Sequence, residues 1–208
     1  MWNELSAAWQ AAFSEAWAAF QQGSIPIGAV ICDQTGSILI CEHNRTGETG
    51  IANRKIAHAE ANALRRLDTA ACNPEELVLY TTMEPCPMCM GTAVMSNIRH
   101  LRYAAHDPYC GCVHWKDSEP YLRRKQLDYV HTGQEPEFVQ LVMQSYFELR
   151  LTNGQDGNPV LAQFRARNAG AVRTAENLFE QKALDRCAAD HAEAAAVYDM
   201  ILSCAAAD

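Results

Sequence analysis

Strand-like and helix-like segments alternate along most of the chain, and this alternation constrains its fold more than any other feature. Apolar runs that predict strands stand at residues 27–33, 37–42, 77–82, 100–105 and 126–132. Apolar residues at helical spacing predict helices at residues 2–23, 58–70, 86–98 and 136–151. Strands that alternate with helices indicate an α/β layer fold built on a mixed sheet.

The composition of the chain changes after residue 152. The stretch TNGQDGNP at residues 152–159 is typical of a linker, because it is polar and rich in Gly and Asn. An Ala-rich segment that predicts helices follows it. We therefore expect one main domain over residues 1–152 and a helical C-terminal extension over residues 153–208.

Charge and cysteine content limit the possible partners and the compartment. The 25 acidic and 17 basic residues give a net charge of -8, which disfavours a nucleic-acid partner. Six of the basic residues lie within residues 99–125, however, and could form a local basic surface. The chain shows neither a basic, apolar leader nor an apolar run of about 20 residues, so we expect a cytoplasmic protein without a membrane span. The nine cysteines are then expected as reduced thiols or metal ligands.

Two short motifs together indicate a metal centre. Cys86 and Cys89 are three residues apart directly after Pro85, so they share a face at the start of a helix. A helix N-terminus lowers the pKa of a thiol, which favours the thiolates that zinc requires. With His58 as a third ligand, a tetrahedral zinc keeps one open position, which is typical of a catalytic site. We predict one catalytic Zn²⁺ per chain.

Glu60 is predicted to carry protons beside this zinc without binding it. Attack of water on an amine-bearing ring carbon needs a group that moves a proton to the ring nitrogen and then to the leaving ammonia. Residues two apart do not share a face inside a helix. The pair therefore works only if His58 stands at the helix start, so that the metal lies off the helix end beside Glu60.

The four letters His-Ala-Glu-Ala occur a second time, at residues 191–194. No Cys-x-x-Cys follows this copy, so it lacks the partners of a metal site. Asp190 followed three residues later by Glu193 is typical of a capping box. We predict that His191 and Glu193 belong to a helix start without a chemical role.

The stretches IPIGAVI, HAEANAL and LYTTMEPCPMCMGTAV, between Ile25 and Val130, resemble the cytidine deaminase superfamily. The branch they resemble holds bacterial guanine deaminase, yeast-type cytosine deaminase and tRNA adenosine deaminase. The resemblance implies a three-layer α/β/α fold with a central mixed five-stranded sheet and the zinc helices packed on it. It also implies a homo-oligomer, most often a dimer.

The same resemblance suggests residues that contact the substrate. Asn44 matches by position an asparagine that hydrogen-bonds the base in these relatives, and an amide offers both a donor and an acceptor. Asp107 and Trp115 lie in the loop where relatives vary their substrate contacts, and both are expected to contact the substrate. Trp115 and Tyr109 could stack on a flat ring.

Four further residues near the predicted site have no role fixed by the sequence. Glu84 matches the family's glutamate before Pro-Cys, where it could also simply favour the helix dipole. Cys110 and Cys112 fit no metal-binding spacing together with His114, so we expect free loop residues.

These observations favour a zinc-dependent hydrolytic deaminase of a small aminated heterocycle, such as guanine, cytosine, a nucleoside or an analogue. One alternative is a tRNA adenosine deaminase, which the basic stretch of residues 99–125 would serve. A second alternative is a non-catalytic structural partner of a deaminase. Such a partner could lose Glu60 freely, and the presence of Glu60 favours catalysis.

Overall fold

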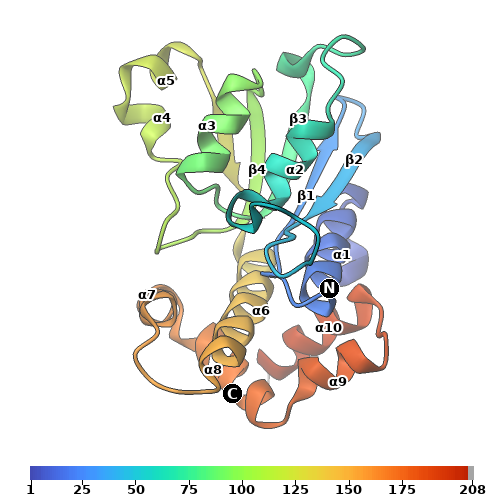
Figure 1. Ribbon diagram of the computed structural model, residues 1–208, viewed down its shortest axis with the longest axis vertical. Helices are drawn as coiled ribbons and strands as arrows, with labels where there is room; N and C mark the ends of the chain where they lie inside the picture. Colours follow the sequence, from blue (N-terminus) through green and yellow to red (C-terminus); the bar gives the residue numbers. More distant parts are fainter. Residues whose placement is uncertain (206–208) are drawn as a thin grey trace.

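A computed structural model describes residues 1–205 and confirms the expected α/β/α architecture around a mixed five-stranded sheet (Figure 1). The strand order is β2-β1-β3-β4-β5. The strands are β1 (Gly28–Cys32), β2 (Ile38–His43), β3 (Val78–Met83), β4 (His100–Ala105) and β5 (Asp128–His131). The strand β1 pairs antiparallel with β2 and β3, whereas β3, β4 and β5 run parallel. The C-terminal ends of these three parallel strands therefore meet at one edge of the sheet.

Helices cover both faces of the sheet because the side chains of the strands alternate between two cores. Ala29 and Ile31 on β1 pack in one core with α2 (Ala59–Arg66) and α3 (Pro87–Met95). Val30 and Cys32 on the same strand face the other core, which α1 and α6 fill. The bounds of these two helices are Ala7–Gln21 for α1 and Gln134–Thr152 for α6.

Gly28 allows α1 to lie directly against the start of β1. A Cβ atom at this position would collide with the carbonyl oxygen of Ala12 and the backbone nitrogen of Ala16. We expect Gly28→Ala to lower the free energy of unfolding by about 1–3 kcal/mol, because helix or strand must shift. Gly91→Ala is the control, since Gly91 is exposed on α3 with open space around it. Equal unfolding midpoints of the two variants in urea would contradict the tight contact.

The C-terminal extension forms helices, as expected, and packs around α6 and α1 (Figure 1). Its helices are α7 (Pro159–Arg167), α8 (Ala169–Glu180), α9 (Ala183–Ala189) and α10 (Ala194–Ala205). The Trp17 indole donates a hydrogen bond of 2.7 Å to the Ala192 carbonyl, and the Tyr146 hydroxyl donates one of 2.7 Å to Asp185. The extension thus shares a hydrophobic core with α1 and α6, and its status as a separate domain stays a prediction.

Two local predictions are wrong. The segment that carries Asp107 and Trp115, expected as a loop, contains α4 (Trp115–Ser118) and leads into α5 (Pro120–Arg124). Asp190 ends α9 rather than starting the next helix, and His191 follows it with a φ of 53°. The backbone N–H of Asp190 donates to Arg186, so the residue completes the last turn of α9.

Short elements complete the described part of the chain. They are the 3-10 helices Trp2–Glu4, Arg54–Ile56 and Pro74–Glu76. Within residues 1–205, none of the helices combines the length and the apolar character that a membrane crossing demands.

Candidate active site

Three predicted metal ligands converge at the N-termini of α2 and α3. His58 is the N-cap residue of α2, as the spacing of His58 and Glu60 requires, and Cys86 is the N-cap residue of α3. Cys89 lies in the first turn of α3, where Pro87 at the first helical position fixes the start of the helix. The Nδ1 atom of His58 is 3.6 Å from the Sγ atom of Cys86 and 3.5 Å from that of Cys89.

These three residues fit a zinc ion. Tetrahedral zinc with ordinary Zn–N and Zn–S bond lengths holds its nitrogen and sulfur ligands about 3.6 Å apart. The three ligand atoms lie within 4.8 Å of one another, and thiolate with imidazole is a donor set that suits zinc. Hydrogen bonds from Cys89 and His58 lower the pKa of the Cys86 thiol to about 4, whereas the same bond to Cys86, together with burial, raises the pKa of the Cys89 thiol.

Glu60 stands beside the three ligands in the first turn of α2. Its side chain is 4% exposed, and the Sγ atom of Cys89 lies 3.2 Å from its Oε2 atom. Burial raises the pKa of the Glu60 carboxyl, and the negative charge of Cys86 adds to this effect. A buried carboxyl that faces the site is placed to accept a proton and to return it.

A cavity of about 210 Å³ opens beside this cluster. His58, Glu60 and Cys86 form part of its lining. Asn44, Asp107 and the loop residues Tyr109 and Cys110 also line it. The sheet explains the position, because β3 and β4 end at this edge and lead into the chain segments that carry Cys86 and Asp107.

Asn44 presents a hydrogen-bond donor to the cavity. The side chain is fully buried, and its Oδ1 atom accepts from the backbone N–H and the hydroxyl of Thr46, at 2.9 and 2.6 Å. These bonds fix the orientation of the amide. The Nδ2 atom has no hydrogen-bond partner among residues 1–205, which leaves its two protons for a ligand.

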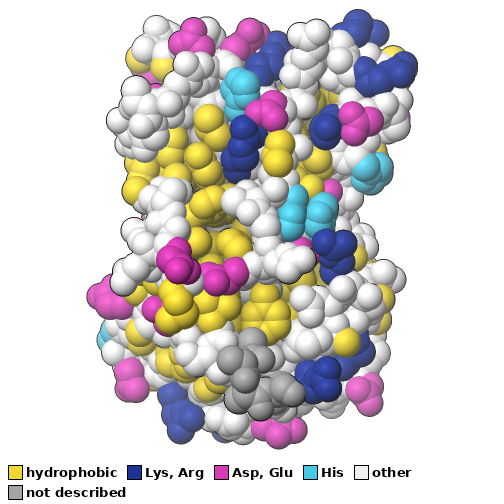
Figure 2. Space-filling view, turned by 180° about the vertical axis from the view of Figure 1, so that it is seen from behind, with side chains coloured by type: hydrophobic (Ala, Val, Ile, Leu, Met, Phe, Trp, Pro, Cys, Tyr) yellow, Lys and Arg dark blue, Asp and Glu magenta, His cyan; other side chains and the backbone are white. Residues whose placement is uncertain are grey.

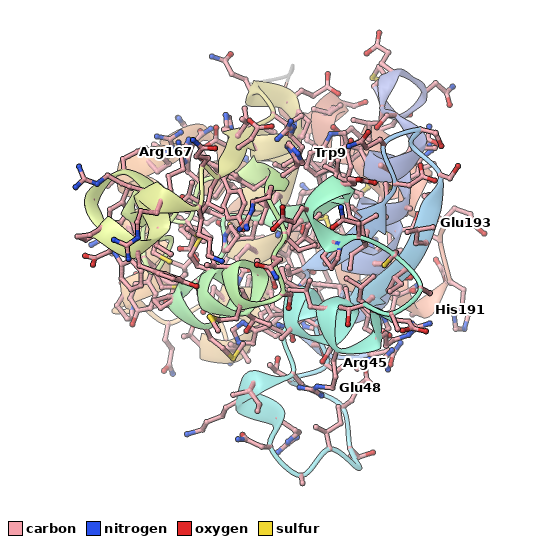
Figure 3. The ribbon with its side chains drawn as sticks, turned by 90° about the horizontal axis from the view of Figure 1, so that it is seen from above. Trp9, Arg45, Glu48, Arg167, His191 and Glu193 are labelled. Atoms are coloured by element: carbon pink, nitrogen blue, oxygen red, sulfur yellow. The ribbon has the colours of Figure 1, made fainter. Side chains whose placement is uncertain are left out.

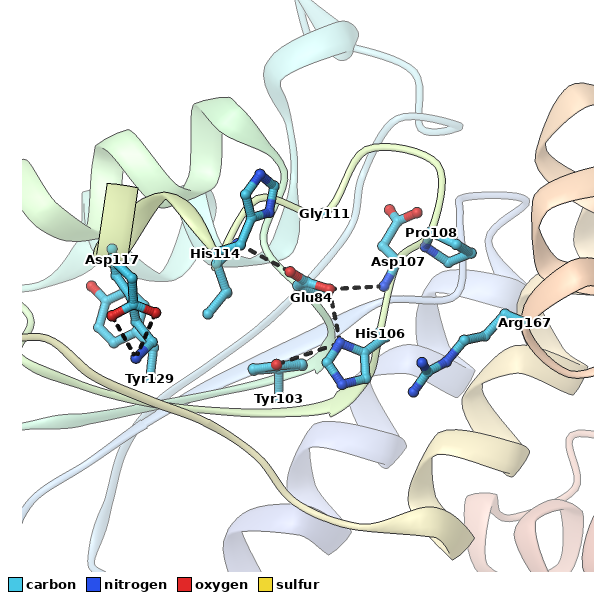
Figure 4. Close-up of a pocket in the computed structure, with 12 residues that line it drawn as sticks. Glu84, Tyr103, His106, Asp107, Pro108, Gly111, His114, Asp117, Tyr129 and Arg167 are labelled. Carbon is cyan, nitrogen blue, oxygen red and sulfur yellow. Dashed lines mark hydrogen bonds and ion pairs between the residues drawn. The ribbon is translucent and has the colours of Figure 1, made fainter. Parts of the chain in front are cut away.

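Glu84 organises the loop between β4 and α4 (Figure 4). Its Oε2 atom accepts from the Asp107 backbone N–H at 3.2 Å, and its Oε1 atom accepts from the Val113 backbone N–H at 3.0 Å. Gly111 passes so close to this carboxylate that a Cβ atom would stand 2.6 Å from it. Glu84 therefore holds the loop in place, a role that the sequence reasoning missed.

The other loop residues occupy different positions. Asp107 lines the cavity, but its Oδ1 atom accepts from the backbone N–H groups of Tyr109 and Cys110 at 2.9 and 3.1 Å. Trp115 is 36% exposed on α4 and does not line the cavity. The substrate contacts predicted for Asp107 and Trp115 stay predictions.

Cys110, Cys112 and His114 do not come together as a metal site within the described part of the chain. The Cys110 thiol donates to the Asp107 carboxylate at 3.0 Å, and the buried Cys112 thiol donates to the Pro85 carbonyl at 3.3 Å. His114 lines a neighbouring cleft of about 480 Å³ instead.

The second copy of the four-letter motif lies apart from the site. His191 and Glu193 are exposed in the turn between α9 and α10, where both side chains lie at the periphery of the molecule (Figure 3). Neither belongs to a group of potential metal ligands in the region 1–205.

Four cavity residues come from the last third of the chain and were not predicted. Gln144 and Glu148 lie on α6, and Val160 and Phe164 lie on α7. No local motif marks them, because they reach the cavity only through the packing of α7 beside α6.

A mixed five-stranded sheet that carries a His-Cys-Cys cluster at two helix N-termini defines the cytidine deaminase superfamily. Within it, the chain belongs to the MafB19-like deaminase family, whose profile matches residues 3–150.

Named relatives and a solved structure are similar to about half to two thirds of the chain. The tRNA-specific adenosine deaminase of Bacillus subtilis (strain 168) is 41% identical over 105 residues, which are 49% of this chain and 62% of that protein. The one of Rickettsia felis is 29% identical over 143 residues, or 66% of this chain and 96% of that protein. A structure from studies of A-to-I editing by tRNA:A34 deaminases is 32% identical, with a TM-score of 0.51 over 61% of this chain and 96% of that one. The chain thus spans less than two thirds of the Bacillus subtilis relative.

Proposed function

We propose that the protein is a zinc-dependent hydrolytic deaminase. One observation carries this proposal: the buried carboxylate of Glu60 lies 3.2 Å from a sulfur of the His58, Cys86 and Cys89 cluster and faces the same cavity. When bound by these three residues, zinc lowers the pKa of water to about 7 and so supplies a nucleophile at neutral pH.

Glu60 moves the protons of the reaction. Its Oε2 atom takes one proton from the attacking water and passes it to the ring nitrogen beside the reacting carbon. The carboxylate then takes the second proton and delivers it to the departing amine, which leaves as ammonia while the ring keeps the oxygen. The Nδ2 atom of Asn44 donates a hydrogen bond that orients the ring. Glu84 holds the loop that carries Tyr109, a residue of the cavity lining.

Adenosine in tRNA is the substrate that the comparisons favour. The relatives that match about half of the chain at 36–41% identity are mostly named tRNA-specific adenosine deaminase. This was the alternative in the sequence analysis, where the net charge of -8 favoured a small heterocycle instead. Net charge is a weak guide, because affinity for RNA depends on the local arrangement of basic residues.

The basic surface is local and interrupted. Arg99 and Arg102 pair with Glu75 and Asp128, at 2.7 and 2.6 Å. Three basic residues stand at the end of α5, namely Arg123, Arg124 and Lys125. None of them forms an ion pair within residues 1–205. On the face turned away in Figure 1, basic and acidic side chains are interspersed without a continuous basic track (Figure 2).

A small aminated heterocycle is the second candidate, and one specific observation favours it. Val160 and Phe164 of the C-terminal extension line the cavity of about 210 Å³, so α7 helps to enclose the bound ring. A free base or nucleoside fits inside such an enclosure. In a polynucleotide, the RNA chain on either side of the bound nucleotide has to extend out of the cavity.

A competition assay distinguishes the two substrates. If tRNA is the substrate, the zinc-loaded protein converts adenosine to inosine in an anticodon stem-loop. Its affinity falls steeply between low and physiological salt, because Lys and Arg neutralise phosphates. Replacing Arg123, Arg124 and Lys125 by alanine should then reduce this slope by about 0.7–0.9 for each lost phosphate contact. Turnover of free bases with no conversion in the stem-loop would establish the second candidate instead.

The expected homodimer stays a prediction that light scattering can test.

A further inference from the structure

The cavity has two walls of different origin. One wall carries the reaction chemistry and comes from the starts of α2 and α3, with His58, Glu60 and Cys86. The other wall comes from α6 and α7, with Gln144 and Glu148 as its polar residues. The helices α6 and α7 pack in one core, and α2 and α3 pack in the core on the opposite face of the sheet. A bound ring whose amine faces Glu60 therefore presents a different edge to α6 and α7.

Both polar groups on this second wall accept hydrogen bonds. The Nε2 atom of Gln144 donates to the Oε1 atom of Glu148 at 3.1 Å, which fixes the amide with its oxygen free. That oxygen is buried and lacks a hydrogen-bond partner within residues 1–205. The Glu148 carboxylate is 8% exposed, and its partners are two neutral amides rather than a cation.

Asn158 joins this wall to the C-terminal extension. Its Nδ2 atom donates to the Oε2 atom of Glu148 at 2.9 Å. Its Oδ1 atom accepts from the backbone N–H groups of Val160 and Leu161, at 2.8 and 3.2 Å, as the N-cap of α7. The same side chain therefore starts the helix that closes the cavity and holds the carboxylate that faces into it.

A buried amide oxygen without a donor is costly unless a ligand supplies an N–H or O–H group. The Glu148 carboxylate, held by two neutral amides, keeps lone pairs that can accept from the same ligand. A phosphate in this place would be repelled by Glu148. Asn44 provides the complementary donor elsewhere on the lining. The cavity thus offers one donor beside the catalytic residues and two acceptors on the α6 wall.

We propose that Gln144 and Glu148 form a subsite that recognises a hydrogen-bond donor on the substrate, away from the amine that reacts. The donor is a second ring amine or a sugar hydroxyl. This inference rests on the proposed deaminase function and assigns its substrate specificity to α6 and the extension. Gln144 and Glu148 contact the substrate without taking part in proton transfer.

The test measures binding rather than turnover. In the zinc-loaded Glu60→Ala protein, calorimetry compares 2,6-diaminopurine with adenine, and adenosine with 2′-deoxyadenosine. Each pair differs by one donor, so the pair that shows selectivity identifies the source of the donor. We expect the donor-bearing member of one pair to bind about tenfold more tightly, because a hydrogen bond to a buried carboxylate is strong.

Glu148→Gln should reduce this preference to less than about threefold. The variant removes the negative charge and replaces one accepting oxygen of the carboxylate by a donor, so a donor on the ligand loses its strongest partner. Glu137→Gln is the matched control, because Glu137 is also buried on α6 but lies outside the cavity lining. The control should retain the full preference.

Two results would overturn the inference. One is equal affinity within both ligand pairs for the Glu60→Ala protein, and the other is a preference that survives Glu148→Gln. If only the tRNA proposal is wrong, the protein forms no inosine in the stem-loop, but it still prefers the donor-bearing member of a ligand pair. Failure of the deaminase proposal shows as the absence of ammonia release from every substrate by the protein that retains Glu60.

Discussion

Glu60→Ala is expected to reduce deamination by about 10² to 10⁴ while the protein keeps its zinc. The carboxylate lies beside the three ligand atoms and is not one of them, so its loss removes proton transfer without opening the metal site. Ammonia release under single-turnover conditions, together with elemental analysis, measures the two effects separately. Glu60→Gln should lose a similar amount of activity, because an amide keeps the shape but cannot shuttle protons.

The chain offers a matched control for this prediction. Glu193 follows a histidine in the same four-letter motif but is exposed in the turn before α10. Glu193→Ala should leave both zinc content and turnover unchanged. A Glu60→Ala protein that deaminates at nearly the original rate would show that another group carries the protons.

Cys86→Ala and Cys89→Ala are expected to abolish activity and to reduce bound zinc to less than about a tenth of the original content. Each change removes a thiolate from a set of three ligands, and two protein ligands hold zinc poorly. Both variants should also unfold at lower temperature, because metal binding contributes to folding. Elemental analysis and thermal unfolding with and without a chelator measure these effects.

Cys72→Ala is the control for general effects of losing a thiol, because Cys72 lies in a turn after α2 and outside the cluster. It should retain one zinc per chain and respond to the chelator as the original protein does. Undiminished zinc in Cys86→Ala or Cys89→Ala would reject the assignment of the ligands.

The sequence predicts the sheet and the helices that position the cluster. Apolar runs locate the five strands, because a strand covered by helices on both faces is apolar along its length, and helical spacing of apolar residues locates the main helices. The two-residue spacing of His58 and Glu60 even predicts that His58 stands at the helix start, where the structure places it as the N-cap.

Local patterns fail where tertiary packing decides. The helices α4 and α5 are too short to show a period, so the stretch looks like a loop. Asp190 and Glu193 imitate a capping box, but Asp190 is used to end α9. The approach of Val160 and Phe164 to the cavity depends on how α7 packs beside α6, and no short stretch of sequence encodes that contact.

Glu84 illustrates a signal that was present but incomplete. Its place before Pro85 and Cys86 matches the family's glutamate, but its partners are the backbone N–H groups of Asp107 and Val113, which lie far along the chain. Gly111 also points to this contact, because only a residue without a side chain can pass so close to the Glu84 carboxylate.

The two-walled cavity has an evolutionary consequence. The residues that bind metal and move protons belong to one face of the sheet, and those on the second wall belong to α6 and the extension. Substitutions around Val160 and Phe164 can therefore alter which molecules enter while the reacting groups keep their geometry. Because the extension also completes the core around α1 and α6, such changes are confined to the residues that face the cavity, while the helices that carry them are kept.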